Sequence, residues 1–151
     1  MSKILITGAS GFIGSFLAEE GLKRGYEVYA GIRKSSSHRY LQDPRIRFME
    51  FDFSTKEAVA ATLRSCKEND IRFDFIIHNA GLTKAQKKED FYNVNCGNTI
   101  RFIEGLMETG MVPDKFIFTS SLAAYGPGNP DTGEPVRLTD KPKPIELYGK
   151  S

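Results

Sequence analysis

The chain has 151 residues, of which 21 are basic and 19 acidic, and its formal net charge is +2. The charges are interspersed, so neither nucleic acid nor a membrane surface is an expected partner, because both attract a concentrated basic region. No apolar stretch approaches the roughly 18 to 20 residues of a membrane span. The N-terminal segment, followed by Glu19 and Glu20, does not resemble a signal peptide. These features predict one soluble, intracellular domain that covers residues 1–151.

The two cysteines, Cys66 and Cys96, lie far apart in the sequence. Their spacing fits neither a zinc site nor a disulfide framework, so we expect no metal site and a cytoplasmic, reducing location. Both thiols are expected to be small side chains of the core.

A strand, a glycine-rich turn and a helix begin the chain. Residues 4–6 form a short apolar run, Gly8, Gly11 and Gly14 follow at three-residue intervals, and apolar residues then recur at helical spacing. The N–H groups of a first helical turn have no partners within the helix, and the helix dipole adds about half a positive charge there. Glycine lets the backbone approach a pyrophosphate that a Cβ would hold away. The segment therefore predicts a dinucleotide-binding turn, with three turn or packing glycines as the alternative.

Strands and helices alternate along the rest of the chain. The first helix is expected to end near residues 23–25. Further strands are predicted at 27–32, 45–51, 73–78 and 115–119, and helices at 54–69, at 90–109 and from 145 onward. An irregular stretch rich in Pro and Gly lies at 125–144. This order implies a doubly wound parallel α/β sheet, the Rossmann fold, with helices on both faces and ligands outside the carboxyl ends of the strands.

Apolar periodicity also predicts which side chains face the core. In the third strand these are Ile46, Phe48 and Phe51. In the long helix they are Phe91, Val94, Phe102, Ile103 and Leu106.

The string TGASGFIG at residues 7–14 resembles the T-G-x-x-G-x-x-G fingerprint of the short-chain dehydrogenase/reductase superfamily. Its Gly-Phe-Ile-Gly ending is similar to the extended branch of that superfamily, the NAD(P)-dependent sugar-nucleotide epimerase/dehydratase family. The resemblance covers essentially the whole chain. It implies that a nicotinamide dinucleotide is bound at the turn by Gly8, Ser10, Gly11, Phe12, Ile13 and Gly14.

The end of the second predicted strand bears on the choice of cofactor. NAD enzymes of this type place Asp or Glu there to hold the ribose 2′-hydroxyl. Here Ile32 is followed by Arg33 and Lys34, whose charges suit a 2′-phosphate, and three serines add hydroxyl groups. We predict NADP, with NAD as the alternative cofactor and a solvated surface loop as the alternative interpretation.

Further cofactor contacts are implied by the resemblance. Asp52 and Phe53 match the family position that contacts adenine, although an ordinary strand-end aspartate is the alternative. The loop after the fourth strand, expected to lie against the cofactor, consists of Asn79, Ala80 and Gly81. His78 is expected to be a hydrogen-bonded core histidine without a catalytic role. Asn95 resembles the Asn of the N-V-x-G-T helix motif, which organises backbone and water near the active site.

Residues 118–126 resemble the S-S-x-x-x-Y-G segment of the family. The resemblance implies that the Ser121 hydroxyl hydrogen-bonds the reacting carbonyl or alcohol, with Ser120 as a near alternative and a pair of turn serines as the other interpretation. Tyr125 is similar to a residue that lines the pocket in some relatives. Tyr148 would be the catalytic base, as the first residue of a Tyr-x-x-x-Lys pattern.

The spacing of that pattern has a physical reason. A lysine four residues after a helical tyrosine lies on the same face and favours the phenolate, whose pKa must fall by about three units from about 10. That lysine would occupy position 152, and the chain ends at Ser151. Lys150 is rotated by about 200° around the helix and cannot replace it. Family members are considerably longer, so we expect a fragment that binds cofactor without turnover.

The resemblance implies an NADP-dependent oxidoreductase or epimerase acting at a hydroxyl or carbonyl carbon of a small molecule such as a nucleotide-sugar. In such an enzyme Tyr148 would transfer the proton of the reacting hydroxyl group, and Ser121 would polarise the oxygen of that group. Epimerases, dehydratases and reductases share this half, so the reaction and substrate stay open. A non-catalytic NADP-binding regulatory or sensor protein is the alternative. Because residues 116–118 would form an exposed apolar strand edge, we also expect a homo-oligomer.

Overall fold

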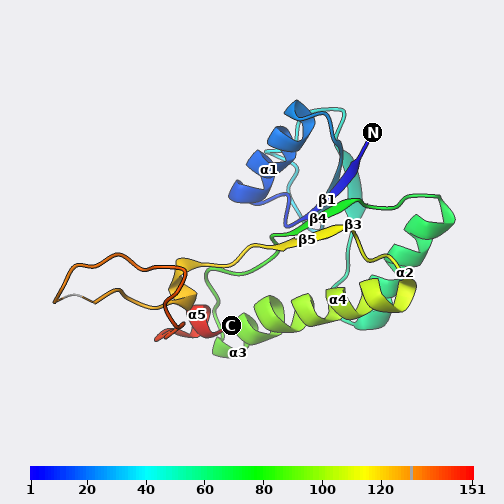
Figure 1. Ribbon diagram of the computed structural model, residues 1–151. Helices are drawn as coiled ribbons and strands as arrows, with labels where there is room; N and C mark the ends of the chain where they lie inside the picture. Colours follow the sequence, from blue (N-terminus) through cyan, green and yellow to red (C-terminus); the bar gives the residue numbers. More distant parts are fainter. Residues whose placement is uncertain (130) are drawn as a thin grey trace. The chain divides into compact units, whose positions relative to one another are not determined.

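The computed structural model describes residues 1–129 and 131–151, which form two compact units (Figure 1). The first unit consists of residues 1–81 and 98–119, and the second consists of residues 82–97 and 120–151. Pro130, which falls in the predicted irregular stretch, lies outside the described residues.

A parallel five-stranded sheet forms the centre of the first unit, with the strand order β3-β2-β1-β4-β5. The strands are β1 (Lys3–Thr7), β2 (Glu27–Ile32), β3 (Arg47–Glu50), β4 (Phe75–His78) and β5 (Lys115–Phe118). The register pairs Thr7 of β1 with Gly31 on one side and with His78 on the other. The three central strands therefore end side by side, and the loops that follow them share one edge of the sheet.

Helices cover both faces of this sheet, as predicted (Figure 1). Helix α1 (Phe12–Lys23) packs on one face, and helices α2 (Lys56–Glu68) and α4 (Asn98–Thr109) pack on the other. Side chains alternate between the faces along each strand, so Ile4 and Ile6 of β1 join the cluster under α1 while Leu5 joins the cluster under α2 and α4. Strands covered on both faces are nearly continuously apolar, which is how β1 and β2 stand out in the sequence.

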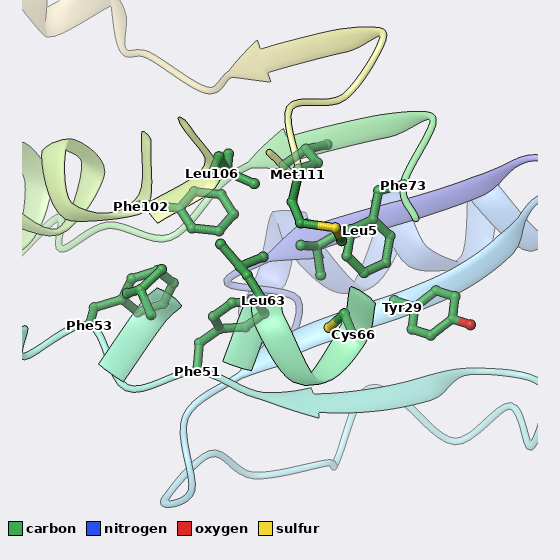
Figure 2. Close-up of a cluster of buried hydrophobic side chains, with 12 residues drawn as sticks. Leu5, Tyr29, Phe51, Phe53, Leu63, Cys66, Phe73, Phe102, Leu106 and Met111 are labelled. Carbon is green, nitrogen blue, oxygen red and sulfur yellow. The ribbon is translucent and has the colours of Figure 1, made fainter. Parts of the chain in front are cut away.

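Aromatic rings fill much of the cluster between the sheet, α2 and α4. Figure 2 shows Leu5, Leu63 and Phe102 from three different elements within it. The Phe102 ring meets those of Phe51 and Phe53 edge-to-face, with centroids 5.6 and 5.7 Å apart, a favourable geometry for aromatic pairs. These contacts anchor the segment that follows β3.

The second unit contains short helices. They are α3 (Lys88–Phe91), a π-helix (Tyr92–Gly97), a 3₁₀ helix (Leu122–Ala124) and α5 (Leu147–Lys150). The predicted helix at 90–109 is therefore divided into three helical segments, and only α4 belongs to the first unit. Among the described residues of the predicted irregular stretch 125–144, none lies in a helix or a strand, as expected.

The third strand is shorter than predicted, and the prediction that Phe48 faces the core is wrong. Met49 packs against the core, so its neighbour Phe48 projects from the opposite face of the strand. There Phe48 is 43% exposed, and its ring stacks on that of His38 with centroids 4.3 Å apart.

Two further predictions of burial are also wrong. Helix α4 buries Phe102 and Leu106, whereas Ile103 is 40% exposed because it lies on the flank that carries Ile100 and Met107. Cys66 is buried on α2 as expected, but Cys96 is exposed, since the π-helix that carries it has no buried residue.

Within the described ranges, no helix combines the length and the apolar composition that a bilayer crossing requires. The same residues contain no group of three or more His, Cys, Asp or Glu side chains arranged to hold a metal ion.

Candidate functional site

The turn between β1 and α1 is held tightly by contacts that only glycine permits. Gly8 has a φ of +67°, and a Cβ there would lie 2.8 Å from the backbone of Ala80 and from the Asn79 carbonyl oxygen. A Cβ on Gly14 would collide with the Gly8 carbonyl oxygen, an oxygen that accepts a hydrogen bond from the Gly11 N–H at 3.1 Å. These two glycines therefore pack the turn against the β4 loop and against the first turn of α1.

The outer side of the same turn is open. A Cβ added to Gly11 would meet only the Gly8 carbonyl oxygen, at 3.3 Å. Within the described part of the chain, no side chain caps the N-terminus of α1 and no acidic residue lies in its first turn. The side chains of Phe12 and Ile13 are 74% and 56% exposed. This arrangement fits a phosphate group, because the N–H groups of the first turn and the positive end of the helix dipole meet no competing side chain.

The loop after β4 is tied to the end of β1. Thr7 Oγ1 accepts a hydrogen bond from the Ala80 N–H at 3.2 Å and lies 2.8 Å from His78 Nδ1. On the other side of the ring, His78 Nε2 is 3.1 Å from Thr99 Oγ1. Burial lowers the pKa of His78 to about 4, so the ring is neutral near pH 7. The prediction that His78 is a hydrogen-bonded core histidine is confirmed.

Basic side chains follow β2 directly, as the sequence shows. Arg33 and Lys34 are exposed, and the backbone turns sharply after them, because Ser36 Oγ accepts a hydrogen bond from the Arg33 N–H at 3.1 Å. The carboxylate of Asp43, the next acidic residue along the chain, accepts hydrogen bonds from Nε and Nη2 of Arg45 at 2.9 and 2.7 Å. Those hydrogen bonds lower the pKa of Asp43 to about 2. The end of β2 thus presents free cations and no free carboxylate among the described residues 33–45.

Asp52 and Phe53 follow β3 and differ in exposure. The Asp52 carboxylate is exposed and accepts a hydrogen bond from the Ser54 N–H at 2.8 Å, which lowers the pKa of Asp52. Phe53 is buried, and its carbonyl oxygen accepts a hydrogen bond from Arg101 of α4 at 3.4 Å. The first unit therefore carries the glycine turn, the β2 end, this pair and the Asn79–Gly81 loop along one edge of the sheet.

Ser121 and Tyr148 lie in the second unit. Ser121 caps the 3₁₀ helix, because its Oγ accepts a hydrogen bond from the Ala123 N–H at 3.2 Å, and its own O–H proton stays available for a ligand oxygen. Tyr148 of α5 is half-buried, with its ring 6.1 Å from that of Phe91. A Cβ on Gly149 would collide with the Ala123 carbonyl oxygen. The segments that carry Ser121 and Tyr148 are therefore packed backbone to backbone.

Asn95 lies in the π-helix, and its side-chain amide hydrogen-bonds both backbone groups of Leu82. Its Oδ1 accepts from the Leu82 N–H at 2.7 Å, and its Nδ2 donates to the Leu82 carbonyl oxygen at 3.0 Å and to Ser151 Oγ at 2.9 Å. A π-helical turn within a longer helix is often found at a functional site. Tyr125, expected to line a pocket, borders an open cavity of about 430 Å³ that is formed by its own unit.

The sequence analysis did not identify three polar side chains that hydrogen-bond the residues of the candidate site. Thr7, Thr99 and Arg101 make the hydrogen bonds described above. Thr7 carries a recognisable signal, because it is a polar residue at the end of a buried strand and directly precedes the glycine turn. Thr99 stands at the Thr position of the N-V-x-G-T motif counted from Asn95. Nothing in the local sequence points to the contact between Arg101 and Phe53, since the two residues are distant along the chain.

Comparison with known proteins places these features in a family. The model of the NAD dependent epimerase/dehydratase family matches residues 4–151. The UDP-glucose 4-epimerase of Bos taurus is 32% identical over 168 residues, an alignment that covers 99% of this chain and 45% of that protein.

Solved structures agree with this match. The UDP-Glc/GlcNAc 4-epimerase from Campylobacter jejuni superposes with a TM-score of 0.81 at 32% identity, covering 99% of this chain and 45% of that one. The Thermus thermophilus UDP-glucose 4-epimerase in complex with NAD superposes with a TM-score of 0.80 at 26% identity, covering 98% and 46%. The chain spans less than half the length of these relatives.

Proposed function

This chain belongs to the NAD dependent epimerase/dehydratase family. We propose that it binds NADP and takes part in an oxidoreduction of the epimerase/dehydratase type. The reaction takes place at a hydroxyl or carbonyl carbon of a nucleotide-sugar or a similar small molecule. The observation that carries this proposal is the turn between β1 and α1, which is closed by Gly8 and Gly14 on its inner side and open above Gly11. That shape suits a pyrophosphate, because the backbone is exposed above Gly11 while Gly8 and Gly14 have no space for a Cβ.

The residues that would hold the dinucleotide lie along one edge of the sheet in the first unit. The turn residues 8–14 would hold the pyrophosphate through backbone N–H groups. Asp52 and the backbone of Phe53 would contact the adenine, and the Asn79–Gly81 loop would border the nicotinamide half. In the second unit, Asn95 would hold the backbone of Leu82 in place through its two hydrogen bonds to it.

The residues after β2 favour NADP over NAD. A guanidinium such as that of Arg33 can pair with a phosphate through two hydrogen bonds, and Arg33 is exposed at the strand end where the ribose would lie. An NAD enzyme needs a carboxylate at this place for the 2′-hydroxyl. The first acidic residue along the chain after β2, Asp43, is already paired with Arg45.

The chemistry would be shared between the cofactor and two side chains. When bound, the nicotinamide ring supplies the acceptor or donor of a hydride. Ser121 would donate its O–H to the substrate oxygen, since its Oγ already accepts from the Ala123 N–H. Tyr148 would accept or return the proton of that oxygen at its phenolic oxygen.

The cofactor choice is tested by titrating the chain with NADPH and with NADH while following nicotinamide fluorescence. We expect tighter binding of NADPH, and we expect Arg33→Ala to weaken it by about tenfold, since one charge-assisted hydrogen-bonded pair is worth roughly 1.5 to 3 kcal/mol. Binding of NADH should change little. Arg24→Ala removes the same charge at the far end of α1 and serves as the matched control.

Equal or tighter binding of NADH by the unaltered chain would contradict the assignment of NADP. Failure to bind either nucleotide would contradict the proposal as a whole.

A further inference from the structure

A chain of hydrogen bonds crosses the interior of the first unit beneath the glycine turn. It runs from Thr7 of β1 through His78 of β4 to Thr99 at the start of α4, with distances of 2.8 and 3.1 Å. Thr7 and His78 are completely buried. Every buried side-chain nitrogen and oxygen of the described, non-exposed residues has a hydrogen-bond partner, so this polar path through an apolar core is fully satisfied.

The direction of these hydrogen bonds follows from the partners of Thr7. Its Oγ1 accepts from the Ala80 N–H at 3.2 Å. Among the described residues, the acceptor left for its own buried proton is Nδ1 of His78. That leaves the proton of the neutral ring on Nε2, from which it is donated to Thr99 Oγ1. Each hydrogen bond is therefore donated in the same direction, from the loop after β4 to Thr7 of β1, from Thr7 to His78 of β4, and from His78 to Thr99 of α4.

The surroundings of His78 keep this arrangement dry and uncharged. The rings of Phe102, Phe116 and Phe118 stack on the imidazole, with centroids 5.0, 6.1 and 6.1 Å away. Burial is the only cause of the lowered pKa of His78, with no charged side chain contributing. Hydrogen bonds are electrostatically stronger in such a medium than in water, and a broken one costs correspondingly more.

One end of this hydrogen-bonded path contacts both backbone segments that would border the dinucleotide, the glycine turn and the Asn79–Gly81 loop. Thr7 directly precedes Gly8, and Gly8 approaches Ala80 so closely that a Cβ would lie 2.8 Å from its nitrogen. Ala80 is in turn the residue whose N–H is bonded to Thr7. A change at His78 would therefore alter the spacing between the glycine turn and the Asn79–Gly81 loop.

We propose that His78 is a positioning residue for the cofactor, which through Thr7 and Thr99 holds the glycine turn and the Asn79–Gly81 loop at the separation that dinucleotide binding requires. It acts through its two threonine partners and does not touch the ligand. This inference rests on the proposed binding of NADP.

The test compares the dissociation constant for NADPH with the free energy of unfolding in four variants. His78→Phe keeps the aromatic stacking but removes both hydrogen bonds of the ring. Thr7→Val keeps the shape of the side chain but removes its hydrogen bonds to His78 Nδ1 and to the Ala80 N–H. Both should weaken NADPH binding by about tenfold, which corresponds to about 1.4 kcal/mol. Thr7→Ser retains the hydroxyl and should bind within about twofold of the unaltered chain, a factor that corresponds to about 0.4 kcal/mol.

Thr109→Val is the matched control. Thr109 is also a buried threonine, but its hydroxyl donates within α4 to the Gly105 carbonyl oxygen at 2.8 Å. This variant should lose stability while its affinity for NADPH stays unchanged. Unaltered affinity in both His78→Phe and Thr7→Val would overturn the inference, and so would an equal loss of affinity in Thr109→Val.

A second readout needs no cofactor. Nitrogen-15 NMR of the ligand-free chain should find His78 neutral, with the proton on Nε2 and none on Nδ1. A proton on Nδ1 would overturn this direction of the hydrogen bonds. If the unaltered protein binds neither NADPH nor NADH, the proposed function fails together with the positioning role, whereas binding that is indifferent to His78 and Thr7 overturns the positioning role alone.

Discussion

At the scale of single residues, His78 makes the stability of the protein depend on pH. In the unfolded chain its pKa is near 6.5, and in the folded chain burial lowers it to about 4. The unfolded state therefore binds a proton first as the pH falls, and the free energy of unfolding decreases between pH 6.5 and about 4. A pKa lowered from 6.5 to about 4, at about 1.4 kcal/mol per pKa unit, corresponds to a loss of about 3 to 4 kcal/mol.

Chemical denaturation at a series of pH values checks this prediction. The unaltered chain should lose that stability across the window from pH 6.5 to 4, and the His78→Phe variant, which has no titrating group at this position, should show a flatter profile. Parallel profiles for the unaltered chain and His78→Phe would contradict the prediction.

At the scale of elements, the junction between the turn and α1 depends on Gly14. A Cβ there would collide with the backbone carbonyl of Gly8, and backbone cannot move aside as a side chain can. Gly14→Ala should therefore lower the free energy of unfolding by about 1 to 3 kcal/mol, as overpacking does. It should also abolish measurable NADPH binding, because the displaced turn is the proposed pyrophosphate site.

Gly21→Ala is the comparison within the same helix. A Cβ on Gly21 would lie 2.9 Å from a methyl group of Val28, a side-chain contact far from the turn. This variant should affect stability and leave the affinity for NADPH unchanged. Equal affinities of the two variants, measured by nicotinamide fluorescence, would show that the close packing of Gly14 is unimportant for the site.

At the scale of the whole molecule, one edge of the sheet favours self-association. Strand β5 pairs with β4 on one side and with no other described strand, and its Ile117 and Phe118 are each 51% exposed. An exposed apolar strand edge is a template for pairing with another chain. We therefore predict a dimer or a higher assembly, observed by light scattering at micromolar concentration.

Charge on that edge should prevent the association. Ile117→Lys is expected to shift the population toward monomer, since a lysine on an edge strand opposes edge-to-edge pairing. Leu138→Lys introduces the same charge at an apolar side chain that is 95% exposed elsewhere, and it should leave the assembly unchanged. A stable monomer of the unaltered chain would contradict the prediction.

Local sequence patterns account for much of the fold. The apolar runs of β1 and β2 identify buried parallel strands, and the glycine at position 25 follows the end of α1 with a φ of +81°. Thr55 caps α2, with its hydroxyl accepting from the Ala58 N–H at 3.1 Å. Each of these features depends on neighbours within a few residues, which is why a single sequence reveals them.

The sequence by itself therefore determined the alternation of strands and helices, the glycine turn and the basic end of β2, because each rests on local backbone preference. Only the tertiary structure decided that Phe48 faces His38, that Ile103 is exposed on the flank of α4, and that His78 reaches Thr99 from 21 residues away. Those outcomes depend on which faces the neighbouring elements cover. Periodicity shows that a side chain can be buried, but only packing decides which partner it meets.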